Sequence, residues 1–230
     1  MQQKSVHGRG RSAGVATPIR SGKAVTRAPL IVAAAGSASV EWAGYGWLTW
    51  SGESRHQGFS HRKSQIGREI ALVAELCAIA DVVRRIPGRR LIILCRNQRA
   101  VEMARRWLRG ESLLPNGYAV QEADSEPVDL VAAQRLLFAQ AERIAAVHWV
   151  GVRERLPLSQ GAHKLAVQAR QHASGRSRLP KGEVLRQATR TAEDYSRRFR
   201  MESRLRCQGG RKGEVKDPTL SVGAMINTCG

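Results

Sequence analysis

Arginine is the residue type with the clearest chemistry in this sequence. The chain of 230 residues carries 38 Lys and Arg against 19 Asp and Glu, which gives a formal net charge of +19. The guanidinium group has a planar, forked set of donors that matches the oxygens of a phosphate. When Lys or Arg neutralises a phosphate, counterions leave the nucleic acid, and their release favours binding. Folding does not explain so large a charge, because like charges oppose compaction. We expect a polyanionic partner: nucleic acid first, with an anionic membrane surface, an acidic protein or a merely solvated surface as alternatives.

Several arginines gather in short stretches and are the expected sequence-independent phosphate contacts. They fall at the end of the first predicted helix, on the second predicted helix and in the C-terminal extension: Arg84, Arg85, Arg89 and Arg90; Arg105, Arg106 and Arg109; Arg197, Arg198 and Arg200. If binding were independent of salt and of Arg-to-Ala changes at these positions, the expectation would fail.

The cysteines carry no metal-site or disulfide pattern. Cys77, Cys95, Cys207 and Cys229 are widely scattered and form no CxxC pair. The spacing therefore indicates neither a zinc site nor a disulfide framework. Two of the four, Cys77 and Cys95, lie in apolar runs, where we expect buried thiols.

The two ends of the chain differ from its middle. Residues 1–29 are rich in Gly, Ser, Arg and Lys and predict a basic flexible arm, while residues 175–230 predict a basic helical extension and tail. The domain is expected over residues 30–174. No apolar run is long enough to span a membrane, and the N-terminus lacks the apolar core of a secretory signal. We expect an intracellular protein, cytoplasmic or nuclear; the acid-free N-terminus, with its Arg and Ser, leaves organelle import open.

Hydrophobic periodicity and turn residues divide the middle of the chain into strands and helices. The expected strands are Leu30–Ala35, Trp42–Trp50, Arg55–His61, Leu91–Cys95 and Ile144–Val150. The expected helices are Ile66–Ile86, Arg99–Arg109, Val131–Ala141, Ser159–Ala173 and, in the extension, Glu183–Arg206. Three strands in an antiparallel meander, followed by strands that alternate with helices, predict a mixed α/β sheet covered by helices.

Four short blocks of sequence follow one another on these elements. They read AAAGS (33–37) with AGYGW (43–47), AEL (74–76), IILCRNQ (92–98), and HWV (148–150) with SQGAHKLA (159–166). In this order, and over residues 30–173, they resemble type 1 ribonuclease H. The resemblance implies an RNase H-like mixed five-stranded sheet flanked by helices, here with basic N- and C-terminal extensions.

The resemblance also implies where a catalytic centre would lie. Enzymes of this family cut RNA paired with DNA by means of two divalent ions that acidic side chains hold about 3.5–4 Å apart. The four acidic positions of the family fall on Ala35, Glu75, Arg96 and His163, so Glu75 is the one acid retained. The loop histidine that assists turnover falls on Arg153.

Arg96 is the substitution with the largest chemical consequence. A guanidinium repels a dication and offers no acceptor to it, but it could take the place of the ion and pair with Glu75 or with a phosphate. His163 would suit a softer metal, and a His–Glu pair does not make a Mg²⁺ site.

These residues also have plain structural interpretations. Glu75 fits an ordinary helix residue, ion-paired with Arg96, and His163 fits a helix-surface histidine. The loop around Arg153 fits a solvated segment. For Trp42, Trp47 and Trp149 we expect packing in the sheet rather than base stacking.

Two further acids, Glu41 and Glu53, could replace a lost carboxylate. Glu41 lies in the turn that follows the first strand, near Ala35 in the sequence. For either acid to replace the lost carboxylate, its side chain would have to reach the same place as the missing one.

We therefore predict a nucleic-acid-binding RNase H-like domain that is catalytically inactive. The alternatives are a divergent metal-dependent RNA–DNA hybrid ribonuclease, a protein-interaction scaffold that docks a partner through the C-terminal extension, and a retroelement-derived RNase H remnant. The expected partner is an RNA–DNA hybrid or duplex RNA, because this fold reads duplex shape, and no membrane is expected. No cofactor is expected; Mg²⁺ or Mn²⁺ belongs to the enzyme alternative.

Overall fold

The computed structural model describes residues 28–60, 69–116, 130–151 and 153–209. The predicted basic arm, except for its last two residues, and the C-terminal tail from residue 210 lie outside the described residues. Within them, the strands are β1 (Leu30–Ala38), β2 (Trp42–Thr49), β3 (Ser54–Ser60), β4 (Leu91–Cys95) and β5 (Ile144–Trp149). The helices are α2 (Ile70–Arg85), α3 (Gln98–Leu108), α4 (Leu130–Ala139), η2 (Ala141–Arg143), α5 (Pro157–Ala173) and α6 (Lys181–Gly209).

The five strands form one mixed sheet in the order β3-β2-β1-β4-β5. β1 pairs antiparallel with β2 and parallel with β4, and β4 pairs parallel with β5. The residues of β4 are all buried, which is typical of a parallel strand covered on both faces. The predicted α/β class, a mixed five-stranded sheet flanked by helices, is confirmed.

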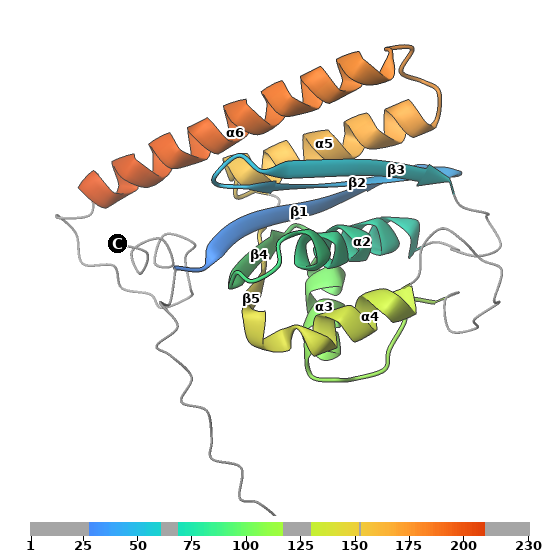
Figure 1. Ribbon diagram of the computed structural model, residues 1–230, viewed down its shortest axis with the longest axis vertical. Helices are drawn as coiled ribbons and strands as arrows, with labels where there is room; N and C mark the ends of the chain where they lie inside the picture. Colours follow the sequence, from blue (N-terminus) through green and yellow to red (C-terminus); the bar gives the residue numbers. More distant parts are fainter. Residues whose placement is uncertain (1–27, 61–68, 117–129, 152, 210–230) are drawn as a thin grey trace, which may run out of the picture.

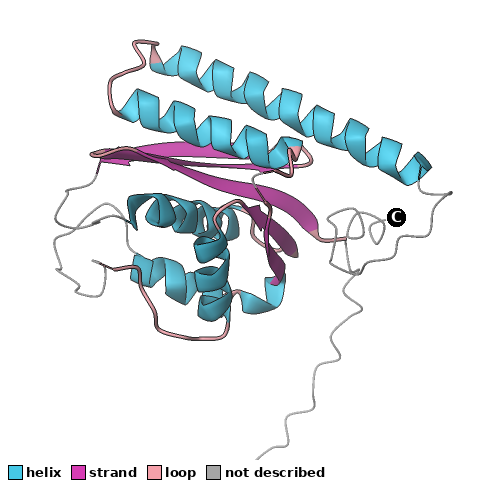
Figure 2. Cartoon of the chain, turned by 180° about the vertical axis from the view of Figure 1, so that it is seen from behind, coloured by secondary structure: helices cyan, strands magenta, loops and turns pink. Residues whose placement is uncertain are grey.

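Helices cover both faces of this sheet (Figure 1). One apolar cluster joins the sheet to α2, α3 and α4, with Val73, Leu76 and Trp107 at its centre. A second cluster joins the other face to α5 and α6 through Leu48, Leu158 and Leu165. The same three layers are visible from behind in Figure 2. Each face of the sheet therefore has its own core.

The C-terminal extension packs on the domain through α6. Ala188, Ala192 and Phe199 are buried in the same cluster as Leu48 of β2. The Ser196 hydroxyl also donates a hydrogen bond of 2.9 Å to the carbonyl oxygen of Thr49. α6 therefore contributes to the core that it shares with the domain. That residues 30–174 form a domain able to fold without the extension remains a prediction.

Element bounds differ from the predicted ones at strand and helix ends. The predicted end of the first strand at Ala35 is wrong, because β1 continues to Ala38 in its pairing with β2. The described part of α2 begins at Ile70, and residues 66–68 of the expected helix lie outside the described residues. α4 ends at Ala139 and a short 3-10 turn follows before β5. Among the described helices, none is long and apolar enough to cross a membrane.

Candidate nucleic-acid interface

The four positions that the resemblance singled out come together at one end of the sheet. The parallel pairing of β1 with β4 ends at Ala34 and Cys95, so Ala35 and Arg96 each follow the last pair. Glu75 approaches from α2 and His163 from α5, and the Gly36 backbone affects the pKa of both side chains. The four positions surround the carboxyl ends of these strands. We call Ala35, Glu75, Arg96 and His163 the central cluster.

Gly36 allows the helix that carries Glu75 to lie this close. A Cβ atom at Gly36 would be 2.7 Å from the Glu75 nitrogen and 2.8 Å from the Ala74 Cβ. Contacts this short do not occur, so any side chain would force α2 away from β1. The glycine that follows Ala35 therefore has a packing role.

Glu75 is buried, with 7 % of its surface exposed. The Cys95 thiol donates a hydrogen bond to its carboxylate, with Sγ and Oε2 3.1 Å apart. Burial raises the pKa of Glu75 from 4.5 to about 7, while the Gly36 backbone, the thiol and the Arg96 charge lower it in part. Near neutral pH this side chain is therefore a mixture of the carboxylate and the neutral acid. No ion pair with Arg96 forms among the described residues.

His163 lies on the other side of the strand ends and is half-buried. Burial lowers the pKa of His163, and the nearby Arg96 guanidinium lowers it further. The cationic imidazole is accordingly disfavoured, because burial removes it from water and a positive charge is already nearby. Arg96 thus acts on both Glu75 and His163 and supplies the positive charge of the central cluster.

These residues do not fit a two-metal site. Mg²⁺ requires several oxygen ligands, and the central cluster offers one carboxyl group, which burial holds partly neutral. In the described ranges there is no group of three or more His, Cys, Asp or Glu side chains that could hold a metal ion. Glu53 cannot replace a missing acid, because the β2–β3 turn lies at the opposite end of β1 from Gly36. Glu41 is an exposed turn residue.

The arginines at the end of α2 and those on α6 lie on either side of the β2–β3 turn. A hollow of about 500 Å³ on one side is lined by Trp47, Glu53, Ser54, Arg85 and Arg89, among others. A hollow of about 560 Å³ on the other side is lined by Ser51, Gly52, Arg190, Arg197 and Arg200, among others. Two of the three predicted arginine groups are thus neighbours in space. Arg190, which was not predicted, belongs with them.

The third group, on α3, lies across the sheet from α6 and is largely engaged by the protein itself (Figure 1). Arg106 and Arg109 form ion pairs with Glu111 at 2.5 and 2.8 Å. Arg105 donates to the backbone oxygen of Val147 at 2.9 Å. The three predicted groups therefore do not make one continuous face.

Arg153 is exposed in the loop before α5. Its side chain makes no hydrogen bond or ion pair within the described part of the chain, so nothing fixes it toward the central cluster. The alignment of the family's loop histidine with this residue remains a prediction.

The tryptophans differ from one another. Trp47 is buried, and its indole N–H donates to Asp81 at 2.8 Å, as expected for a packing residue. Trp149 is paired with Cys95 in the sheet, but its side chain is 50 % exposed and is not buried in the core. It is the last residue of β5, and none of the described strands lies beyond β5 at this edge of the sheet. In the sequence, the position of Trp149 at the end of a predicted strand was the feature that could have indicated its exposure.

No protein-family model and no curated protein matches this chain. Among solved structures, it is similar to the N-terminal RNase H domain of rv2228c from Mycobacterium tuberculosis, fused to maltose binding protein. The identity is 18 %, the TM-score 0.40, and the match covers 64 % of this chain and 98 % of that chain.

A second similar protein is the foamy viral protease-reverse transcriptase. In its complex with an RNA/DNA hybrid, the identity is 15 %, the TM-score 0.43 and the coverage 70 % of this chain and 22 % of that chain. In its complex with dsDNA, the values are 14 %, 0.44, 65 % and 98 %. Likenesses at this level assign no activity or ligand to this chain. The RNase H-like fold rests instead on the observed strand order and on the placement of the helices.

Proposed function

We propose that this chain is a nucleic-acid-binding domain of the RNase H-like fold that does not cleave its ligand. The observation that carries the proposal is the composition of the central cluster. Arg96 provides a permanent positive charge where a metal-binding centre needs carboxylates, and the one retained acid is buried against a thiol. Such a cluster favours a phosphate over a dication.

The charge of the whole chain supports the same function. A formal charge of +19 raises the local concentration of a polyanion and makes its binding sensitive to salt. Exposed arginines beside the β2–β3 turn add contacts that do not depend on base sequence. The ligand class we propose is a duplex with A-like shape, an RNA–DNA hybrid or duplex RNA.

A combined binding and cleavage assay tests this function. Purified protein is mixed with labelled RNA–DNA hybrid, duplex RNA and duplex DNA, in Mg²⁺ or Mn²⁺, and both mobility and strand length are followed. We expect salt-sensitive complexes with the hybrid or duplex RNA and no shortening of either strand.

The variant Glu75→Ala, run in parallel, separates the proposal from the enzyme alternative. Metal-dependent cleavage by the wild type that Glu75→Ala abolishes would establish a divergent nuclease and refute the proposed inactivity. If no duplex were bound at low salt, the nucleic-acid function would be refuted.

A further inference from the structure

Trp149 is an exposed aromatic side chain whose indole nitrogen is held by a hydrogen bond. Its indole N–H donates to the backbone oxygen of Arg96 at 3.1 Å, while half of its surface remains exposed. This bond joins the end of β5 to the segment that links β4 to α3. The ring is therefore held beside the central cluster.

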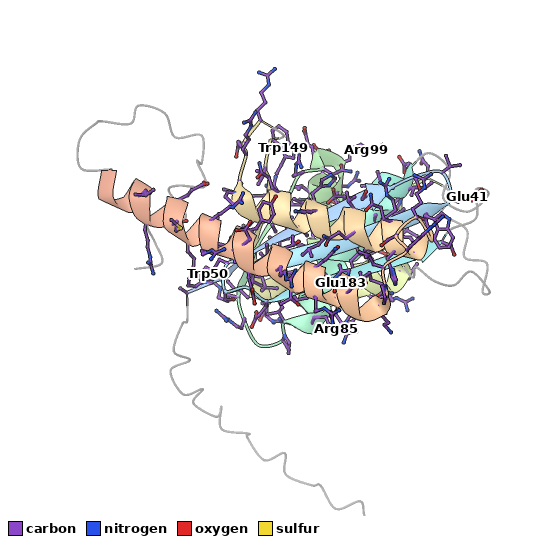
Figure 3. The ribbon with its side chains drawn as sticks, turned by 90° about the horizontal axis from the view of Figure 1, so that it is seen from above. Glu41, Trp50, Arg85, Arg99, Trp149 and Glu183 are labelled. Carbon is purple, nitrogen blue, oxygen red and sulfur yellow. The ribbon has the colours of Figure 1, made fainter. Side chains whose placement is uncertain are left out.

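The surroundings of the ring leave it accessible. Gly151 of the following loop has no side chain to cover the ring: a Cβ atom there would be 3.7 Å from the outer edge of the indole and 3.6 Å from the Glu154 carboxylate. In Figure 3, Trp149 is labelled on the opposite side of the molecule from Arg85 and Glu183. An exposed apolar ring of this size has an energetic cost in water, which a stacked ligand would remove.

The charges around Trp149 indicate what such a ligand would be. The ring is hydrogen-bonded to the backbone of Arg96, whose guanidinium charge acts on Glu75 and His163 in the adjacent central cluster. The loop that follows β5 carries exposed Arg153 and Arg155 with one acid, Glu154. A flat apolar surface with cations beside it is complementary to a nucleotide, whose base stacks while its phosphate pairs with Arg. An acidic peptide would use the charges but not the ring.

We infer that Trp149 is a stacking platform for an unpaired base, with Arg96 placed to pair with the phosphate next to that base. This inference rests on the proposed nucleic-acid function and makes its ligand more specific. Bases inside a duplex have both faces covered by their neighbours, so only a base in a single-stranded extension or at an end can stack on the protein. The ligand is then a duplex with a single-stranded extension.

Trp50 provides a matched control. It is also exposed, at 41 %, but it follows β2, in another part of the molecule from Trp149 (Figure 3). Its backbone oxygen accepts a hydrogen bond of 2.8 Å from Arg200. A general effect of removing an exposed tryptophan would therefore appear in Trp50→Ala as well.

Three labelled RNA–DNA hybrids test the inference: a blunt duplex, the same duplex with a short single-stranded extension, and that extension with abasic nucleotides in place of its bases. The abasic probe keeps every phosphate and removes only the stacking partner. The wild type should bind the base-containing extension about tenfold more tightly than the abasic one, since stacking on an aromatic side chain has an effect of this size. Trp149→Ala should lose this preference, and Trp149→Phe and Trp50→Ala should keep most of it.

The outcomes separate the two proposals. If every hybrid binds but base-containing and abasic extensions bind alike, or if Trp149→Ala keeps the preference, the stacking inference is overturned and the proposed function stands. If the wild type binds no probe, both are overturned. Thermal unfolding of Trp149→Ala and Trp149→Phe shows whether each variant is folded, and the Phe variant decides the question if the Ala variant is not.

Discussion

At the scale of single residues, Glu75 shows how burial changes the chemistry of a retained acid. In an enzyme of this fold type the corresponding carboxylate would need its charge for a metal. Here burial raises the pKa of Glu75 to about 7, and its hydrogen-bond partner is the Cys95 thiol.

The raised pKa of Glu75 predicts how stability depends on pH. Between pH 4.5 and about 7, the folded protein holds a proton on Glu75 that the unfolded chain has released. Raising the pH through this window therefore lowers the free energy of unfolding, by about 3 kcal/mol in total. The Glu75→Gln variant has no carboxyl group to titrate at this position. Its free energy of unfolding, relative to that of the wild type, should therefore rise as the pH increases from 5 to 8. Urea unfolding of both proteins across this range measures it, and parallel profiles would contradict the prediction.

Asp81 is a second residue whose surroundings predict a large effect. This buried carboxylate accepts the Trp47 N–H at 2.8 Å and forms ion pairs with Arg55 and Arg85 at 3.3 and 3.6 Å. Asp81→Ala leaves the buried indole N–H without a partner and should lower the free energy of unfolding by about 2 kcal/mol. Asp81→Asn keeps an acceptor and should cost less.

Asp194→Ala is the matched control for Asp81. Its two ion pairs, with Arg197 and Arg198, lie on the exposed side of α6. Surface pairs contribute little, so a loss below about 1 kcal/mol is expected. Equal losses for Asp81→Ala and Asp194→Ala in denaturant unfolding would show that the buried network is not stabilising.

At the scale of elements, α6 decides how the second face of the sheet is covered. Its inward residues join the cluster of β2 and α5, whereas Leu185, Met201 and Leu205 on the same helix are exposed. Phe199 is the largest of the inward residues, with 4 % exposure. The helix predicted from the basic extension is therefore an amphipathic element of the fold.

Phe199→Ala should lower the free energy of unfolding by about 3 kcal/mol, because it opens a cavity between α6 and the sheet. Leu205→Ala, on the same helix and 66 % exposed, should change it by less than about 0.5 kcal/mol. Thermal unfolding measures both. Two similarly small effects would mean that α6 is not part of the cooperative unit, in favour of a domain that ends near residue 174.

At the scale of the whole molecule, the positive charge is unevenly available. Arg84 and Arg90 are exposed near the β2–β3 turn end of the sheet, and no partner of either lies within the described residues. Arg106 and Arg109 share Glu111 instead. Free arginines gain more from a phosphate than arginines that must first leave an ion pair.

The double variant Arg84→Ala/Arg90→Ala should therefore weaken binding of an RNA–DNA hybrid and reduce the slope of log affinity against log salt by about two. Arg106→Ala/Arg109→Ala removes the same formal charge and should change the slope less. A salt titration of binding compares the pairs, with thermal unfolding to show that both variants are folded. Identical slopes for the two pairs would show that total charge alone governs binding.

The sequence by itself determined the order of strands and helices, the mixed sheet and the excess of positive charge. These follow from local periodicity, turn residues and composition, which need no knowledge of distant contacts. The resemblance of the sequence blocks to type 1 ribonuclease H also marked the positions of the central cluster, Ala35, Glu75, Arg96 and His163.

Only the tertiary structure decided what these residues touch. The Cys95 thiol beside Glu75, the close approach at Gly36 and the carbonyl of Arg96 that fixes Trp149 all join segments far apart in the chain. The exposure of Trp149 depended on β5 being the edge of the sheet, which is a property of strand order rather than of β5 itself. The burial, the hydrogen-bond partners and the pKa of a side chain depend on the residues that surround it in space. Those residues come from several helices and strands, so only the tertiary structure brings them together.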